Sequence, residues 1–121
     1  MRCSTKFLSA ATIAEKHYDW LSWDGTIGVR EESLDNYFRN GIGKIDFVKI
    51  DVENHELAVL KGMVNVIKKH HPVMSVEVHQ RPTTLTSCDC NVCQWMKEQG
   101  LSVELHGKYT PDMDAHWLIA R

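Results

Sequence analysis

The sequence lacks several features that would place it in a specialised class of proteins. Its 121 residues contain no apolar run that approaches the roughly 18 residues needed to span a membrane. It has no dense basic cluster, and its formal net charge is -2, which excludes the electrostatic footprint of a nucleic-acid-binding protein. It has no internal repeat and no low-complexity segment. The composition, 43% hydrophobic and 25% charged, is that of one small globular domain.

Cysteine is also scarce and unevenly spread. One of the four cysteines is Cys3, and the other three, Cys88, Cys90 and Cys93, lie within six residues. This spacing is unsuited to a disulfide framework, so we expect reduced thiols. The stretch Phe7–Ala14 is interrupted by polar residues and followed at once by an acidic one, unlike the apolar core of a signal peptide. We therefore expect a cytoplasmic protein.

The most informative stretch predicts a strand, a helix and a second strand. The run Ile45–Val52 is rich in β-branched residues, and its apolar residues occupy both odd and even positions. This pattern predicts a strand buried on both faces. Asn54 is placed to cap the helix that follows, and Pro72 ends it. One apolar stripe runs along that helix at spacings of three and four: Leu57, Leu60, Val64 and Ile67. Because Val73–His79 predicts another strand, the segment reads as a parallel βαβ unit.

Weaker signals flank this unit. Ser33 is placed to cap a short helix before it, and residues 1–32 form a poorly defined segment in which Ala10–Asp19 favours a helix. After it, Asn91–Gln99 predicts a helix that ends at a glycine. Leu101–Leu105 and His116–Ala120 then predict two strands, which we expect to form an antiparallel pair at one edge of the sheet.

Polar side chains end both predicted strands of the unit. Asp51 and Glu53 end the first strand, and Glu77 and His79 end the second. The carboxyl ends of parallel neighbours lie at one edge of a sheet, where open α/β sheets bind ligands. A carboxylate there can take a proton from a hydroxyl group, or hold a divalent cation that lowers the pKa of that hydroxyl. No spacing of cysteine or histidine demands a metal at this edge, so we expect none there. The alternative is that these groups only cap the helix and pair with Lys or Arg.

For Glu56 and for the cysteines, the sequence allows both a functional and a structural interpretation. Glu56 lies in the first helical turn, where a carboxylate stabilises the helix dipole, so we favour a structural role. Cys88, Cys90 and Cys93 form a C-x-C-x-x-C pattern typical of zinc ligands. The zinc reading needs a fourth ligand from elsewhere, for which His79 and His106 are available. We favour the alternative of reduced thiols at a loop and helix start.

Three segments together resemble one family of enzymes. They are E-S-L-D-N-Y-F at 32–38, I-D-F-V-K-I-D-V-E-N-H-E-L-A-V-L-K-G at 45–62 and P-V-M-S-V-E-V-H at 72–79. In residue identity and spacing they resemble the C-terminal half of the FkbM family of S-adenosylmethionine-dependent methyltransferases. The resemblance implies a partial Rossmann-like α/β fold for residues 33–121, with S-adenosylmethionine as cofactor. It implies O-methylation of a small-molecule or glycan hydroxyl. From their places near the strand ends, we expect catalytic roles for Asp51, Glu53 and Glu77 and acceptor-side roles for His55 and His79.

The chain departs from the family in two respects. The family has glycine at the position of Asn54, but asparagine also tolerates a left-handed backbone, so we expect the turn to survive. The glycine-rich turn that cradles the cofactor is absent, because Gly25 and Gly28 do not follow an apolar strand. We therefore expect the first three strands of the family fold to be missing and the chain to be a truncated enzyme.

The missing strands would leave the strand Ile45–Val52 at an open edge of the sheet. Because such edges recruit partners, we expect the chain to self-associate or to dock onto a missing N-terminal half. Two alternatives to an enzyme stay open. One is a non-catalytic remnant or interaction module that keeps the βαβ core, and the other is a small zinc-binding module built on the cysteines.

Overall fold

The computed structural model describes residues 2–3, 11–12, 25–26, 30–80, 87–107 and 114–121. The first three of these ranges form a small antiparallel sheet of β1 (Arg2–Cys3), β2 (Ala11–Thr12) and β3 (Gly25–Thr26), in the order β2-β1-β3. The helix predicted for Ala10–Asp19 is wrong at Ala11–Thr12, which pair as a strand with β1. The rest of that prediction lies outside the described residues.

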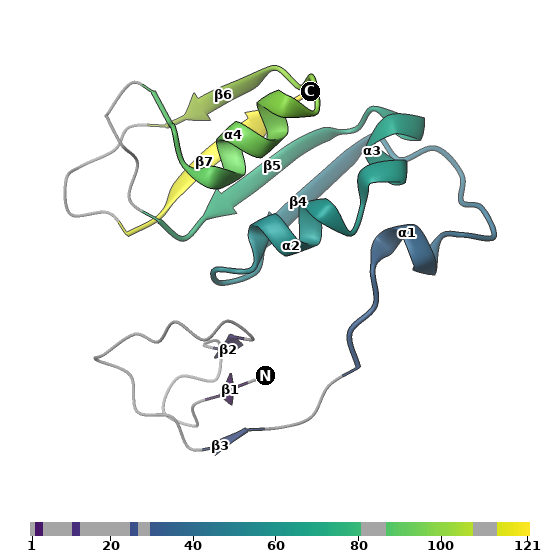
Figure 1. The fold of residues 1–121 in the computed structure, drawn as a ribbon, viewed down its shortest axis with the longest axis horizontal. Coiled ribbons are helices and arrows are strands. Elements are labelled where there is room, and N and C mark those ends of the chain that lie inside the picture. The colour runs from purple at the N-terminus through teal and green to yellow at the C-terminus, as the bar shows by residue number, and fades with distance from the viewer. Residues whose placement is uncertain (1, 4–10, 13–24, 27–29, 81–86, 108–113) are drawn as a thin grey trace.

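The main sheet has four strands in the order β4-β5-β7-β6 (Figure 1). They are β4 (Phe47–Asp51), β5 (Val73–Val78), β6 (Val103–His106) and β7 (His116–Ala120). β4 and β5 are parallel, and β7 runs antiparallel to both β5 and β6. The fold is therefore mixed α/β, and both the parallel βαβ unit and the antiparallel C-terminal pair are confirmed.

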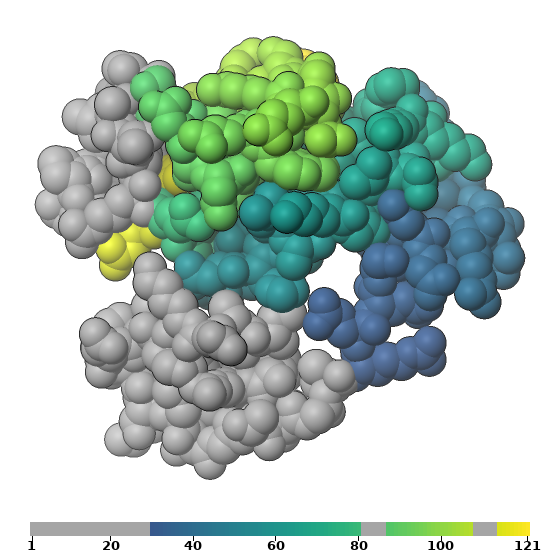
Figure 2. Space-filling view, viewed as in Figure 1, coloured from purple at the N-terminus to yellow at the C-terminus, as the bar shows by residue number. Residues whose placement is uncertain are grey.

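Three helices cover one face of this sheet: α2 (Glu56–Lys61), α3 (Val64–His70) and α4 (Asn91–Glu98). In the space-filling view α4 and α2 lie side by side over the strands (Figure 2). The core forms where alternate residues of β5 and β7 meet these helices, and it includes Met74, Val76, Val78, Leu118, Ala120, Leu60, Met63 and Met96. None of the helices in the described ranges is long and apolar enough to cross a membrane.

β4 differs from its prediction in burial. Ile50 is 2% exposed, whereas Phe47 on the opposite face is 59% exposed. The expectation of a strand buried on both faces is wrong for the described part of the chain, because α2, α3 and α4 all pack on one face. In that same part of the chain β4 has a neighbouring strand, β5, on one side only.

The single helix predicted after β4 is divided in two at Gly62 and Met63. The division is explained by α1 (Leu34–Tyr37), whose N-cap is Ser33 as predicted. The backbone N–H of Asp35 donates to the Gly62 carbonyl at 2.9 Å. The Asp35 carboxylate accepts from the backbone N–H groups of Asn65 and Val66, both at 3.0 Å. Asp35 thus satisfies donors at the start of α3 that a continuous helix would have used internally.

The turn between β4 and α2 is left-handed. Glu53 and Asn54 have φ angles of 48° and 72°. The prediction that Asn54 caps α2 is wrong, because the N-cap is His55, which makes no capping hydrogen bond with its side chain. The expectation that asparagine accommodates a left-handed turn at this position is confirmed.

Candidate functional site: an acidic cluster at the strand ends

The carboxyl ends of β4 and β5 bring four of the predicted residues together. His79 Nε2 lies 3.4 Å from Glu53 Oε2. It lies 3.9 Å from Asp51 Oδ1 and 3.9 Å from Glu77 Oε1. We call Asp51, Glu53, Glu77 and His79 the acidic cluster. The imidazole is its centre, with three carboxylates around one ring nitrogen.

The register of the sheet explains this convergence. Asp51 and Glu77 are directly paired in the parallel ladder, so their side chains leave the same face of the sheet. His79 lies two residues beyond Glu77 and continues on that side. The left-handed backbone at Glu53 turns the chain from β4 toward α2 and keeps this carboxylate beside the strand ends. The cluster is therefore fixed by two strands and one tight turn.

A fifth carboxylate, that of Glu56, holds the histidine from the other side. Glu56 is 1% exposed, and its Oε1 lies 2.7 Å from His79 Nδ1. The same oxygen accepts from the backbone N–H groups of Asn54 at 3.0 Å and His79 at 3.4 Å. Burial alone would raise the pKa of Glu56, but these hydrogen bonds outweigh it and lower the pKa. Glu56 is thus a buried carboxylate that joins the turn after β4 to the end of β5.

The surroundings of His79 favour its charged form. The hydrogen bond to Glu56 raises the pKa of His79 against the opposing effect of burial, and the charges of Glu53, Glu56 and Glu77 raise it further. One imidazolium therefore faces several carboxylates. Lys49 adds a second positive charge, with its Nζ 3.1 Å from Asp51 Oδ2. The cluster still carries more negative than positive groups.

This arrangement suits a small divalent cation. One ligand atom from each of Asp51, Glu77 and His79 lies within 4.8 Å of the others. Because Nδ1 of His79 is engaged by Glu56, its Nε2 faces the carboxylates, as in the carboxylate–histidine pairs that orient metal ligands. Carboxylate oxygens are typical ligands of Mg²⁺ and Mn²⁺, and imidazole nitrogen is a typical ligand of transition-metal ions. A cation would take the place of the imidazolium proton.

His55, also predicted on the acceptor side, lies apart from these contacts. Its Nε2 is 3.5 Å from Glu31 Oε1. Its side chain lines a small pocket with Leu34 and Gly62, on the side of α2 that faces α1. The ion pairs described for the acidic cluster do not include His55.

The cysteines have a partner that sequence reasoning missed. His116 Nε2 lies 2.9 Å from Cys88 Sγ and 3.6 Å from Cys90 Sγ. Neither His79 nor His106, the two histidines considered from the sequence, takes this place. A histidine at the start of the last strand was visible in the sequence. Its position beside the thiols depends on the pairing of β7 with β5, which the sequence pattern did not predict.

Comparison with known proteins now identifies the family. Residues 2–103 match the Methyltransferase FkbM domain. The chain belongs to the FkbM methyltransferase family. Over 60 residues it is 40% identical to the hexuronic acid methyltransferase AglP of Haloferax volcanii. That alignment covers 49% of this chain and 25% of AglP, so the match spans about a quarter of the length of this curated relative. No solved structure shows a significant match.

The family match confirms the resemblance that the sequence motifs indicated. Methyl transfer is the activity after which this FkbM family is named. The match begins at residue 2, so it includes the N-terminal segment to which the sequence motifs gave no role.

Proposed function

We propose that this chain acts in S-adenosylmethionine-dependent methylation of a hydroxyl group on a small molecule or glycan, and that the acidic cluster is the acceptor side of the site. One observation carries the proposal: three carboxylates surround one histidine at the carboxyl ends of the parallel strands in an FkbM-family chain. Ligands of open α/β sheets bind at that edge. The name of AglP makes a hexuronic acid the first acceptor to test.

The acceptor hydroxyl must lose its proton as it gains the methyl group. Asp51 and Glu53 are the exposed members of the cluster, at 39% and 33% of their side chains, so a substrate can reach them. Either carboxylate can accept the proton, and a cation held by Asp51, Glu77 and His79 would lower the pKa of the hydroxyl. The strand ends supply the fixed positions that methyl transfer requires. Glu56 acts through His79 and is a positioning residue.

The cofactor supplies an activated methyl group. The sequence has no glycine-rich turn after an apolar strand, so we assign no residue of this chain to cofactor binding. The roles proposed above therefore concern the acceptor alone.

A methyl-transfer assay tests these roles. The chain is incubated with methyl-labelled S-adenosylmethionine, a hexuronic acid oligosaccharide and Mg²⁺. We expect Asp51→Asn and Glu77→Gln to reduce the rate by about 10²-fold or more, the usual contribution of acid–base groups. Glu104→Gln is the matched control, because Glu104 is an exposed carboxylate of the same sheet that pairs with Arg121. We expect it to keep the rate of the unaltered chain.

Calorimetric titration with S-adenosylhomocysteine separates the proposal from its main alternative. One-to-one binding would show that residues of this chain form a cofactor site and would support an enzyme. A folded chain that neither binds S-adenosylhomocysteine nor transfers a methyl group would overturn the proposal. That result would favour a non-catalytic interaction module that keeps the βαβ core.

We also propose that the chain associates with a second copy of itself through β4. Phe47 of β4 and Val73 of β5 are paired in the parallel ladder, and both are exposed, at 59% and 37%. An edge strand with an adjoining apolar pair is a typical site of strand-to-strand association.

A further inference from the structure

A second group of ligand atoms lies at the same end of the sheet, on elements that the proposed methyl transfer does not use. Cys88 and Cys90 precede and cap α4, and His116 is the first residue of β7. Cys88 Sγ lies 3.1 Å from Cys90 Sγ, and His116 Nε2 lies 2.9 Å and 3.6 Å from these two sulfurs. Cys88 is 4% exposed and His116 is fully buried. A buried site with two thiols and an imidazole is therefore already assembled.

The orientation of His116 is that of a metal ligand. Its Nδ1 lies 2.6 Å from the carbonyl oxygen of Gln80, which can only accept, so Nδ1 carries the hydrogen. The lone pair of the neutral ring is then on Nε2, which faces both sulfurs. A backbone carbonyl that fixes the ring through Nδ1 is a common partner of metal-bound histidines.

Hydrogen bonds already hold the two sulfurs together at the start of α4. Cys88 Sγ donates to Cys90 Sγ at 3.1 Å. The backbone N–H of Cys93 donates to Cys90 Sγ at 3.4 Å. A metal ion would displace the proton that the two sulfurs share and bind both as thiolates.

We propose that Cys88, Cys90 and His116 bind a zinc ion. Sulfur and imidazole nitrogen are the preferred ligands of zinc. Bound at about 2.3 Å and 2.0 Å, tetrahedral sulfur and nitrogen ligands lie roughly 3.5–3.8 Å from one another. The observed separations of 2.9 to 3.6 Å require only a small outward movement of the side chains. The 3.1 Å between the sulfurs is far longer than the roughly 2.05 Å of a disulfide.

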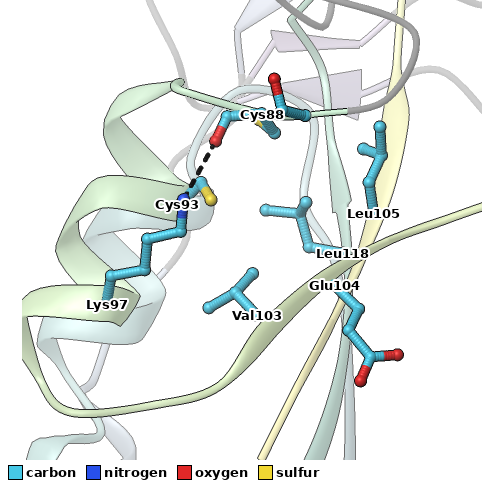
Figure 3. Close-up of a pocket in the computed structure, with 8 residues that line it drawn as sticks. Cys88, Cys93, Lys97, Val103, Glu104, Leu105 and Leu118 are labelled. Atoms are coloured by element: carbon cyan, nitrogen blue, oxygen red, sulfur yellow. Dashed lines mark hydrogen bonds between the residues drawn. The ribbon is translucent and has the colours of Figure 1, made fainter.

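The three ligands differ from the set considered from the sequence, because His116 takes the place given to Cys93. Cys93 lines a pocket of about 390 Å³, and so does Cys88. Figure 3 shows Cys93 on the same side as Val103 and Glu104 of β6. Its thiol is not part of the group of mutually close ligand atoms. Cys93 contributes its backbone N–H, and the fourth position of a tetrahedral zinc remains for a further ligand.

This zinc site would be independent of the acidic cluster in its chemistry. The cysteine site offers soft sulfur and nitrogen, whereas the acidic cluster offers mainly oxygen, which suits Mg²⁺ or Mn²⁺. Zinc would connect the start of α4 to the start of β7. Through the hydrogen bond between His116 and Gln80 it would also hold the chain just after His79. The proposed role is therefore structural and supports the strand ends.

Zinc content tests the proposal directly. The purified chain is loaded with zinc, passed through a desalting column and measured by elemental mass spectrometry. We expect one zinc per chain, and at least a tenfold loss of zinc in Cys90→Ser and in His116→Ala. Cys3→Ser and His106→Ala remove a cysteine and a histidine outside the set, and we expect both to keep the zinc. Asp51→Asn should also keep it, which separates this site from the acidic cluster.

A spectroscopic measurement on the unaltered chain covers the case in which the variants do not fold. Cobalt in place of zinc should give the visible bands of a tetrahedral ion and a sulfur-to-cobalt charge-transfer band. Removal of the metal with a chelator should lower the melting temperature. A folded chain that takes up neither zinc nor cobalt would overturn the proposal. Loss of zinc in the Asp51→Asn variant, together with retention of zinc in the Cys90→Ser variant, would also overturn the proposal.

Discussion

At the scale of single residues, the contact between Glu56 and His79 decides the geometry of the acidic cluster. The side chains of His79 and Glu56 are only 10% and 2% exposed. Glu56 is the first residue of α2, and His79 follows the last residue of β5. Removing one partner of a buried, hydrogen-bonded charge pair lowers the free energy of unfolding by more than the pair itself contributes. The reason is that the other charge is left buried and uncompensated. The ordering of the candidate site and the stability of the fold therefore depend on the same hydrogen bond.

The pair predicts a defined dependence of stability on pH. Glu56 has a lowered pKa, so its contribution is complete above its ordinary value of 4.5 and is lost as the pH falls through the lowered value. His79 has a raised pKa, so its contribution is complete below 6.5 and is lost as the pH rises through the raised value. We expect the contribution of the pair to the free energy of unfolding to be greatest between pH 4.5 and 6.5. Urea denaturation across pH 4 to 9 measures it.

Removing the Glu56 charge should weaken this dependence. We expect Glu56→Gln to lower the free energy of unfolding by about 1–3 kcal/mol at pH 6, the range for a buried group that loses its partner. The pKa of His79, followed by NMR, should fall in the same variant. Glu104→Gln, at an exposed carboxylate, is the control and should change neither quantity. An unaltered His79 pKa in Glu56→Gln would contradict the geometry described here.

The sequence predicted part of this site. Asp51, Glu53, Glu77 and His79 could be grouped because parallel strands end at one edge of a sheet. The contact of Glu56 with His79 could not be predicted, because it depends on how the left-handed turn at Asn54 presents α2 to the end of β5.

At the scale of secondary-structure elements, the short helix α1 stabilises the start of the neighbouring helix α3. Its four residues are too few to be stable alone. Asp35 gives it a role by accepting two backbone hydrogen bonds from the first turn of α3. A side chain from one helix thus serves as the N-terminal cap of another, which is 30 residues away in the chain.

We expect Asp35→Ala to destabilise the fold by about 1–2 kcal/mol, the usual cost of losing a capping group together with its favourable charge at a helix N-terminus. Urea denaturation measures the change. Asp46→Asn is the control, since the Asp46 side chain is 71% exposed and pairs with Lys44. Equal stability of the Asp35 variant and the unaltered chain would show that water replaces the carboxylate at α3 without cost.

The order of the main elements from α1 to β7 was predictable, because apolar periodicity and capping residues mark them. The division between α2 and α3 was not predictable from periodicity, since the apolar stripe from Leu57 to Ile67 continues across it. The division depends on the contact of Gly62 and Asn65 with α1. A Cβ at Gly62 would lie 3.2 Å from Ser33 Cβ, so glycine allows α1 to approach closely.

At the scale of the whole molecule, the helices cover one face of the main sheet, and the other face of β4 is exposed. This asymmetry leads to a prediction about assembly. We expect sedimentation velocity to show association that increases with protein concentration. Phe47→Lys should reduce it by placing a charge on the exposed pair with Val73. Tyr37→Lys is the control, because Tyr37 is 66% exposed but lies on α1. A monodisperse monomer with a sharp melting transition would contradict the prediction.

The position of β7 has a consequence for the order of folding. β7 lies between β5 and β6, so the strand that comes last among the described residues is needed before β6 can join the sheet. Among the described strands β6 pairs with β7, its next neighbour along the chain, whereas β7 pairs with the more distant β5. The pairing of β7 with β5 is thus the non-local contact that attaches β6 to the sheet, and such contacts form late. In a refolding experiment with pulsed hydrogen exchange, the amides of Val103–His106 should gain protection with those of His116–Ala120, and not before them. The C-terminal half of the sheet would then appear in a single kinetic step.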